Sequence, residues 1–164
     1  MTVSFVRIDD RMIHGQTLTR WAKEYPCDGL IAINDAAAAN KVLTQAYKGA
    51  SDKKTFVWTV EAFGQKSQKV LESATRYFVI TKNPIDMKRI LVDQGFVPSG
   101  VTEIIVGPCN DRPGAIKLGN NQSITQAEAD AFEAIEKAGY RVKFQLLPDV
   151  SIGYWSDFKS KFGY

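Results

Sequence analysis

Short apolar runs alternate with amphipathic stretches along the whole chain. The apolar runs predict buried strands at 3–8, 30–33, 55–60, 77–81 and 103–106. Between them, apolar residues recur with the spacing of one helix face in 16–24, 36–50, 61–74 and 84–94. Thr125 and Glu128 form a capping box that should begin another helix, ending near Gly139. A strand with one wet face is expected at 141–146, because Val142, Phe144 and Leu146 alternate with polar residues, and a last short helix follows.

Strands that alternate with helices in this way are typical of an α/β protein with a mostly parallel sheet. The length of 164 residues fits one domain. We therefore expect a single-domain, open, mostly parallel β-sheet with helices on both faces, extending over 1–164. The polar stretch 107–123 is expected to be a loop, and Trp21, Trp58 and Trp155 are interpreted as packing residues.

Composition excludes several classes of protein. The hydrophobic content of 45% and charged content of 24% are ordinary for a globular domain. Apolar runs are far shorter than the ~20 residues of a membrane helix, and Arg7 interrupts the opening too early for a signal peptide. Two cysteines, Cys27 and Cys109, cannot build a disulfide framework, so a reduced cytosolic protein is expected. A net charge of +3 is too small to indicate nucleic-acid binding.

The candidate chemistry lies in two loops that follow strands, where open α/β sheets bind ligands. The first is Arg7-Ile8-Asp9-Asp10-Arg11-Met12-Ile13-His14-Gly15-Gln16, which holds the single histidine of the chain. The second is Gly107-Pro108-Cys109-Asn110-Asp111-Arg112-Pro113-Gly114. Any imidazole chemistry must therefore use His14.

A neutral imidazole is a nucleophile that can accept a transferred phosphoryl group. Arg11 and the free amides of the following helix would hold the negative charge. Asp9 or Asp10 would bond the other ring nitrogen and orient His14. Gly15 would let a partner come close. The segment thus predicts a phosphohistidine site.

Other interpretations remain open. His14 can be an ordinary surface residue, the aspartates a turn and a helix cap, and Arg11 a solvated charge. A second function is a non-catalytic module that binds an anionic ligand or a phosphorylated partner. A third is a regulatory domain phosphorylated on Asp9 or Asp10.

No cofactor or metal site is expected. The chain has neither a G-x-G-x-x-G after its first strand nor a Walker loop. The spacing of His14, Cys27 and Cys109 does not suit zinc. Cys109 has no second histidine to activate it, so we interpret it as a buried thiol.

The segment from Arg7 to Gln16 closely resembles the active-site stretch of the IIB subunit in the mannose/fructose/sorbose family of the bacterial sugar phosphotransferase system. The pair Asn34-Asp35 and the turn Ile105-Val106-Gly107-Pro108 are also similar to that family. Met12 and Thr17 depart from it, since the family more often has Leu and Val there.

The resemblance implies a mostly parallel α/β fold and a phosphoryl carrier. His14 would accept the phosphoryl group from a phosphohistidine of the IIA partner and pass it to the sugar imported by the membrane IIC/IID complex. Arg11 would contact the phosphoryl group, with Arg7, Asp9, Gly15, Gln16 and Arg112 as further binding residues. The protein would be cytoplasmic and peripherally associated with the permease. The sugar stays open among galactosamine-type, mannose, fructose and sorbose, and so does the existence of a homo-oligomer.

Overall fold

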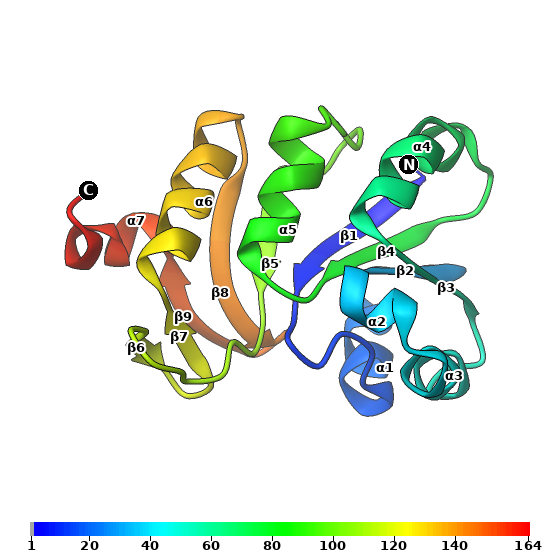
Figure 1. The fold of residues 1–164 in the computed structure, drawn as a ribbon, viewed down its shortest axis with the longest axis horizontal. Helices are drawn as coiled ribbons and strands as arrows, with labels where there is room; N and C mark the ends of the chain where they lie inside the picture. The colour runs from blue at the N-terminus through cyan, green and yellow to red at the C-terminus, as the bar shows by residue number, and fades with distance from the viewer. Residues whose placement is uncertain (1) are drawn as a thin grey trace.

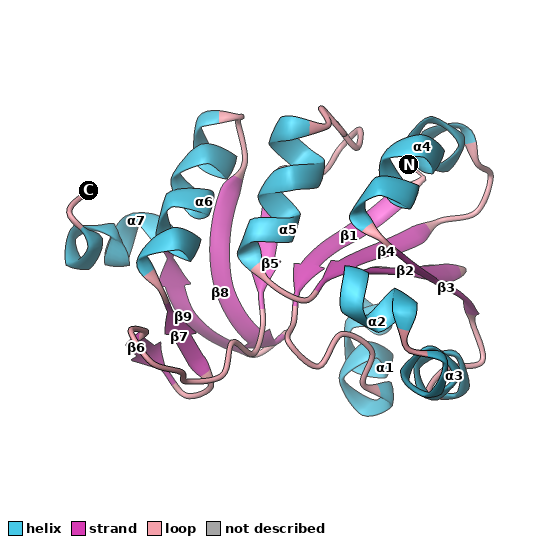
Figure 2. Cartoon of the chain, in the orientation of Figure 1, coloured by secondary structure: helices cyan, strands magenta, loops and turns pink. Residues whose placement is uncertain are grey.

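The computed structural model describes residues 2–164, apart from the side chain of Gln16. Seven strands form one sheet in the order β3-β2-β4-β1-β5-β8-β9 (Figures 1 and 2). They are β1 (Val3–Ile8), β2 (Gly29–Ile33), β3 (Lys54–Trp58), β4 (Tyr77–Thr81), β5 (Glu103–Val106), β8 (Arg141–Leu147) and β9 (Val150–Tyr154). Neighbouring strands are parallel, except that β9 pairs antiparallel with β8. The expected single-domain, mostly parallel α/β sheet is confirmed.

Helices cover both faces of the sheet, as expected (Figure 1). One face carries α1 (Gly15–Glu24), α2 (Asp35–Ala39) and α3 (Lys41–Gly49). The opposite face carries α4 (Val60–Glu72), α5 (Pro84–Lys88) with the π-helical turn η1 (Arg89–Asp93), α6 (Gln126–Lys137), α7 (Trp155–Phe158) and the 3₁₀ turn η2 (Lys159–Phe162). The parallel strands need such crossover helices, which bury both faces of the sheet.

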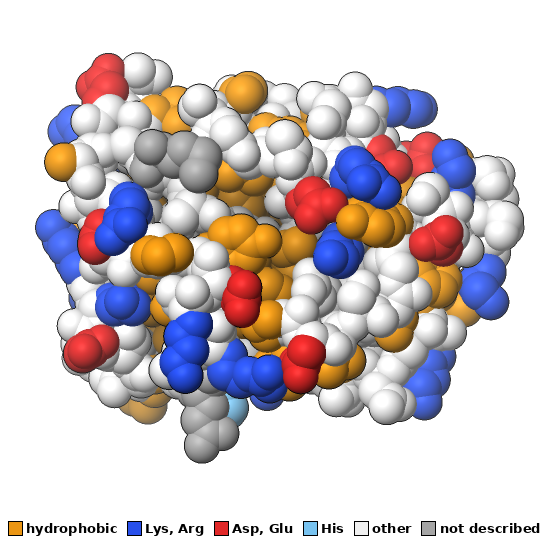
Figure 3. Space-filling view, turned by 180° about the vertical axis from the view of Figure 1, so that it is seen from behind, with side chains coloured by type: hydrophobic (Ala, Val, Ile, Leu, Met, Phe, Trp, Pro, Cys, Tyr) orange, Lys and Arg blue, Asp and Glu red, His pale blue; other side chains and the backbone are white. Residues whose placement is uncertain are grey.

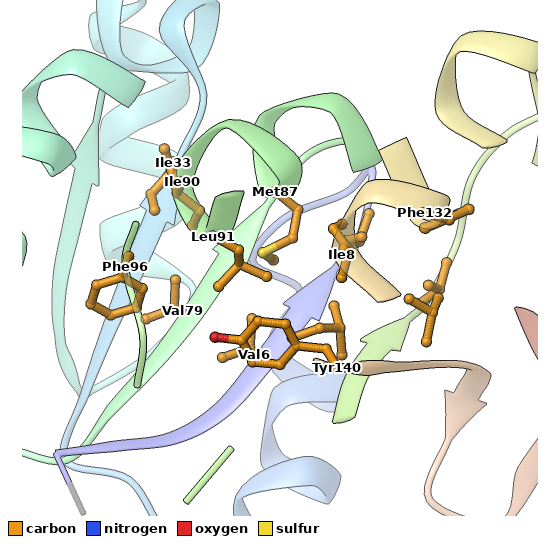
Figure 4. Packing of buried hydrophobic residues seen from close by; sticks show 14 of the residues in the cluster. Val6, Ile8, Ile33, Val79, Met87, Ile90, Leu91, Phe96, Phe132 and Tyr140 are labelled. Atoms are coloured by element: carbon orange, nitrogen blue, oxygen red, sulfur yellow. The ribbon is translucent and has the colours of Figure 1, made fainter. Parts of the chain in front are cut away.

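Two hydrophobic clusters, one on each face, hold the layers together. The larger cluster includes Ile8 of β1, Met87 and Leu91 of the following α5–η1 segment, and Phe132 of α6 (Figure 4). In the smaller cluster, the ring of Phe5 stacks on Trp21 of α1 with centroids 4.7 Å apart.

The three tryptophans serve packing, as interpreted from the sequence. Trp21 and Trp155 are fully buried, and Trp58 packs partly buried against the larger cluster. Full burial of each such aromatic side chain stabilises the fold by about 2–3 kcal/mol through the hydrophobic effect.

The expected helix at 36–50 is two helices, because Asn40 interrupts it. Asn40 has extended φ and ψ angles of −102° and 106°, and its side chain accepts a hydrogen bond from the amide of Leu43 at 3.0 Å. Asparagine favours this capping role over a helix interior. The helical spacing in the sequence also places Ala46 and Ala74 on buried faces, but both are exposed, and Ala74 lies beyond the end of α4.

The stretch 107–123, expected to be a loop, contains the strand β6 (Ile116–Gly119) and most of the strand β7 (Gln122–Ile124). These two strands pair as a small antiparallel hairpin. Asn121 turns this hairpin with a left-handed φ of 54°. The wet face expected for 141–146 is wrong at Gln145, which is buried, and its side-chain amide is satisfied by donating to the carbonyl of Pro148 at 2.9 Å. Within residues 2–164, no helix has the length and hydropathy needed to cross a bilayer.

Candidate active site

The two loops singled out by the sequence lie side by side, because β1 and β5 are adjacent parallel strands. The amide of Asp10 donates to the carbonyl of Pro108 at 2.9 Å. In return, the amide of Asn110 donates to Asp10 Oδ2 at 2.7 Å. The two loops therefore meet at the carboxyl edge of the sheet.

A tight turn leads from β1 to the histidine. The amide of Met12 donates to the carbonyl of Asp9 at 2.9 Å, and the amide of Arg11 donates to Asp9 Oδ1 at 2.8 Å. Asp9 therefore closes an Asx turn with its own side chain. Met12 has a left-handed φ of 55° and a buried side chain. That conformation costs about 1–3 kcal/mol in a residue other than glycine, and such strain collects at functional sites.

Arg7 is a buried support of this turn rather than a binding residue, which corrects the expectation from the sequence. Its side chain is 1% exposed. Its Nη1 and Nη2 donate to the carbonyls of Gln145 and Leu146, each at 3.0 Å. Its Nε and Nη2 contact Asp9 Oδ2 at 3.4 Å, and its guanidinium lies 5.1 Å from the Trp21 ring centroid. Burial lowers the pKa of Arg7, and the Asp9 carboxylate opposes that shift.

His14 is exposed and stands at the N-cap of α1. Its carbonyl accepts the first helical hydrogen bond, from the amide of Leu18 at 3.0 Å. Within the described part of the chain, no side chain caps this helix. The first-turn amides and the positive end of the helix dipole are therefore available to an anion. Figure 3 shows the histidine at one edge of the molecule, beside positively charged side chains.

Thr17 connects His14 to Arg11. Its Oγ1 lies 3.3 Å from His14 Nδ1 and 3.5 Å from Arg11 Nη2. The Arg11 side chain is 43% exposed, and its Nε lies 3.6 Å from Asp9 Oδ1. The buried carboxylate of Asp9 thus contacts the buried side of the Arg11 guanidinium. The other side of this guanidinium is exposed at the surface, near His14.

A shallow cleft of about 290 Å³ opens beside these residues. Its lining is Arg11, Thr17, Pro108, Asn110, Asn121, Leu146 and Leu147. Ligand sites usually measure about 300–1,000 Å³, so this cleft is just below that range. It suits an anion or a partner's side chain better than a deeply enclosed substrate.

Asp10 does not orient the histidine, contrary to the expectation. Its Oδ2 is engaged by Asn110, and the ring nitrogen Nδ1 meets Thr17 instead. Asp10 Oδ1 is buried and has no hydrogen-bond partner among the described residues. Burial, followed by the Asp9 charge, raises the pKa of Asp10. Asp10 therefore fastens the two loops to each other.

Phosphorylation of Asp9, one of the two aspartates considered as alternatives, fails on geometry. Asp9 is 1% exposed, with Oδ1 bonded to the amide of Arg11 and Oδ2 facing Arg7. A receiver aspartate needs an accessible carboxylate oxygen to attack phosphorus.

The remaining predicted binding residues have different surroundings. A Cβ on Gly15 would lie 2.9 Å from the carbonyl oxygen of Ala50, so Gly15 admits the chain's own backbone rather than a partner. Arg112 forms an ion pair with Glu128 in a neighbouring hollow of about 320 Å³, which Lys82 also lines. Arg112 is thus not brought to the cleft beside His14. The side chain of Gln16 lies outside the described residues.

Cys109 is buried, and this burial raises the pKa of its thiol to about 12. It is therefore protonated and unreactive near neutral pH, as the sequence predicted. Thr17, by contrast, was missed as a site residue. The signal that could have revealed it is its departure from the family pattern. Thr17 has a hydroxyl where the family more often has a methyl group of Val, one helical turn from the histidine.

The chain is similar to one family of known proteins over almost its whole length. The family described as "PTS system sorbose subfamily IIB component" matches residues 3–163. The chain is 30% identical over 152 residues to the mannose-specific EIIAB component of Escherichia coli K12, covering 90% of this chain and 45% of that protein. It is 28% identical over 160 residues to the fructose-specific EIIB component of Bacillus subtilis, covering 90% of each. It thus spans about half of the EIIAB relative.

The fold is likewise similar to a solved structure. The crystal structure of the IIBSor domain of the sorbose permease from Klebsiella pneumoniae superposes with a TM-score of 0.82. The identity is 26%, and 93% of each chain is covered.

Proposed function

The chain belongs to the sorbose subfamily of phosphotransferase-system IIB components, and we propose that His14 is its phosphoryl carrier. His14 takes the phosphoryl group from a phosphohistidine of IIA and passes it to a sugar that the IIC/IID membrane complex imports. The observation that carries this proposal is the environment of the only histidine. His14 is exposed at an uncapped helix N-terminus, and Thr17 links its Nδ1 to Arg11.

The accepting atom in this proposal is Nδ1. Nδ1 faces Thr17 and, through it, the guanidinium of Arg11. A phosphoryl group on Nδ1 would therefore be near a fixed positive charge and the open amides of α1. The transfer is an in-line displacement in which positioning and electrostatics supply the catalysis. One nitrogen–phosphorus bond forms as the other breaks.

Arg11 contributes without holding the group too tightly. Its side chain is 43% exposed, and water screens it on one side. The Asp9 carboxylate, 3.6 Å from the guanidinium, offsets part of its positive charge. A carrier needs this balance because the phosphoryl group must leave again for the sugar hydroxyl. The carbonyls of Gln145 and Leu146 fix Arg7, and Arg7 in turn fixes Asp9. Asp9 then keeps the Arg11 guanidinium close to Thr17 and His14.

The proposed partners determine where the protein works. A donor phosphohistidine has to approach Nδ1 of the exposed His14 in line, so IIA covers the turn from Asp9 to His14. The permease later presents its sugar to the same nitrogen. The protein therefore works in the cytoplasm at the membrane surface. The mannose-, fructose- and sorbose-specific names of the relatives all suit this proposal, and the choice of sugar belongs to the permease.

The test is phosphorylation by the general phosphotransferase proteins, phosphoenolpyruvate and IIA. We expect one phosphoryl group per chain, stable in alkali and lost in acid, and none in His14→Gln. Thr19→Val is a matched control on the same helix, because the Thr19 hydroxyl bonds the carbonyl of Gly15 and is exposed. Undiminished labelling of His14→Gln contradicts the assignment. If the wild-type protein binds phospho-IIA but gains no phosphoryl group, the chain is a binding module and not a carrier.

A further inference from the structure

We propose that the hydroxyl of Thr17 selects Nδ1 of His14 as the nucleophile and then transfers its hydrogen bond to the arriving phosphoryl group. This inference rests on the proposed function and names a residue that the family pattern does not supply. The evidence is the contact of Thr17 Oγ1 with His14 Nδ1 at 3.3 Å and with Arg11 Nη2 at 3.5 Å.

The direction of the hydrogen bonds follows from which groups can donate. A guanidinium has donors only, so Thr17 Oγ1 accepts from Arg11. The hydroxyl has one hydrogen, which remains for another acceptor. Within the described residues, His14 Nδ1 is the further partner of this oxygen. Thr17 therefore donates to Nδ1.

A donor facing Nδ1 fixes the tautomer of the neutral imidazole. Nδ1 keeps its lone pair, and the ring proton stays on Nε2. Thr17 is 8% exposed and lies in the first turn of α1, so the helix restrains its side chain. Thr19, two residues on, bonds the carbonyl of Gly15 at 2.8 Å and shows the usual alternative for a helical threonine.

The transfer step balances with this tautomer. The Nδ1 lone pair forms the new bond to phosphorus, while the electron pair of the breaking bond returns to the donor nitrogen. The proton on Nε2 does not move. The Thr17 hydroxyl loses its acceptor when Nδ1 is phosphorylated, and a phosphoryl oxygen takes its place. Arg11 continues to donate to Thr17 or turns to the phosphoryl oxygens directly.

The first experiment reads the tautomer without any partner. Nitrogen chemical shifts of the imidazole in ¹⁵N-histidine-labelled, unphosphorylated protein report on His14 alone, because it is the only histidine. We expect a pyridine-like Nδ1 and a protonated Nε2 in the wild type and in Thr17→Ser. Thr17→Val replaces the hydroxyl with a methyl group of similar size, and we expect it to change the tautomer ratio by about three- to tenfold, as for one neutral hydrogen bond. Thr19→Val should match the wild type.

The second experiment measures transfer from phospho-IIA and spontaneous loss of the phosphoryl group in the same variants. Thr17→Val should slow transfer by about three- to tenfold, with Thr17→Ser restoring most of the rate. A wild-type imidazole protonated on Nδ1, or a Thr17→Val tautomer ratio equal to that of the wild type, overturns the proposal. The tautomer result stands without phosphorylation, so absent labelling of the wild type would count against the proposed function alone.

Discussion

Asp9→Asn should destabilise the fold strongly, because it removes the carboxylate that lies between two guanidinium groups. Asp9 is 1% exposed and accepts from the amide of Arg11 at 2.8 Å. Its other oxygen lies 3.4 Å from Nε and Nη2 of Arg7, which is equally buried. Asparagine keeps the shape and can still accept from Arg11. Its amide would leave the buried charge of Arg7 without a counterion.

The magnitude follows from the burial and the distances. Removing one partner of a buried ion pair costs about 3–5 kcal/mol. The contacts with Arg7 are longer than the ~2.7–2.9 Å of strong charge-assisted hydrogen bonds. Arg7 also keeps the carbonyls of Gln145 and Leu146 as acceptors. We therefore expect a loss of about 3 kcal/mol, the lower end of that range. With an m-value of about 1.5–3 kcal/mol/M in urea, the unfolding midpoint falls by about 1–2 M.

Urea unfolding followed by tryptophan fluorescence measures this loss. Asp28→Asn is the matched control, since Asp28 also pairs with an arginine, Arg76, but on the exposed surface. Its midpoint should hardly change. The double variant Arg7→Met with Asp9→Asn removes both buried charges and should recover part of the loss. An Asp9→Asn midpoint equal to that of Asp28→Asn would refute the reasoning.

Three further predictions concern charge, pH and partners. Arg11→Ala should slow transfer from phospho-IIA by about 10²–10³ with little effect on folding, and Arg11→Lys should recover part of the rate; a wild-type rate in Arg11→Ala would show that the residue is only a surface charge. Burial raises the pKa of Asp10 above its ordinary value of 3.8, so its contribution to stability is complete below pH 3.8 and is lost as the pH rises through the folded-state pKa. Asp10→Asn should remove that fall in the free energy of unfolding, measured by urea titrations at successive pH values, and an unchanged pH profile would contradict the shift. IIA and the permease should compete for the turn from Asp9 to His14, with faster IIA association at low salt; chemical-shift changes confined to the opposite face would exclude this docking.

Most of the fold could be predicted because the signals are local. β1, β4 and β5 lie where the apolar runs place them, and Thr125 with Glu128 caps α6 as expected. The break at Asn40 was missed because capping preference competed with the apolar spacing of a continuous helix. The hairpin of β6 and β7 and the edge strand β9 were missed because short, polar strands depend on pairing rather than on their own sequence.

The candidate site was predictable in position but less so in detail. A cluster of charges after a central strand indicates the carboxyl edge of the sheet, and His14 and Arg11 lie there. Arg7 was expected to be a binding residue, whereas the structure buries it fully, which is rare for arginine. Its acceptors, the carbonyls of Gln145 and Leu146, are 138 and 139 residues away, and no local pattern reveals such partners.

The distance along the chain between Arg7 and its two carbonyl acceptors also sets an order of assembly during synthesis. The turn that carries His14 leaves the ribosome well before β8, which lies more than 120 residues further along the sequence. Until Leu146 has emerged, the guanidinium beneath Asp9 has neither of its backbone acceptors. A nascent chain therefore displays its histidine long before Arg11 has a fixed support. The support of Arg11 is thus complete only once β8 has been translated, so a ribosome stalled before β8 is expected to expose the histidine without the arginine geometry that the proposed transfer needs.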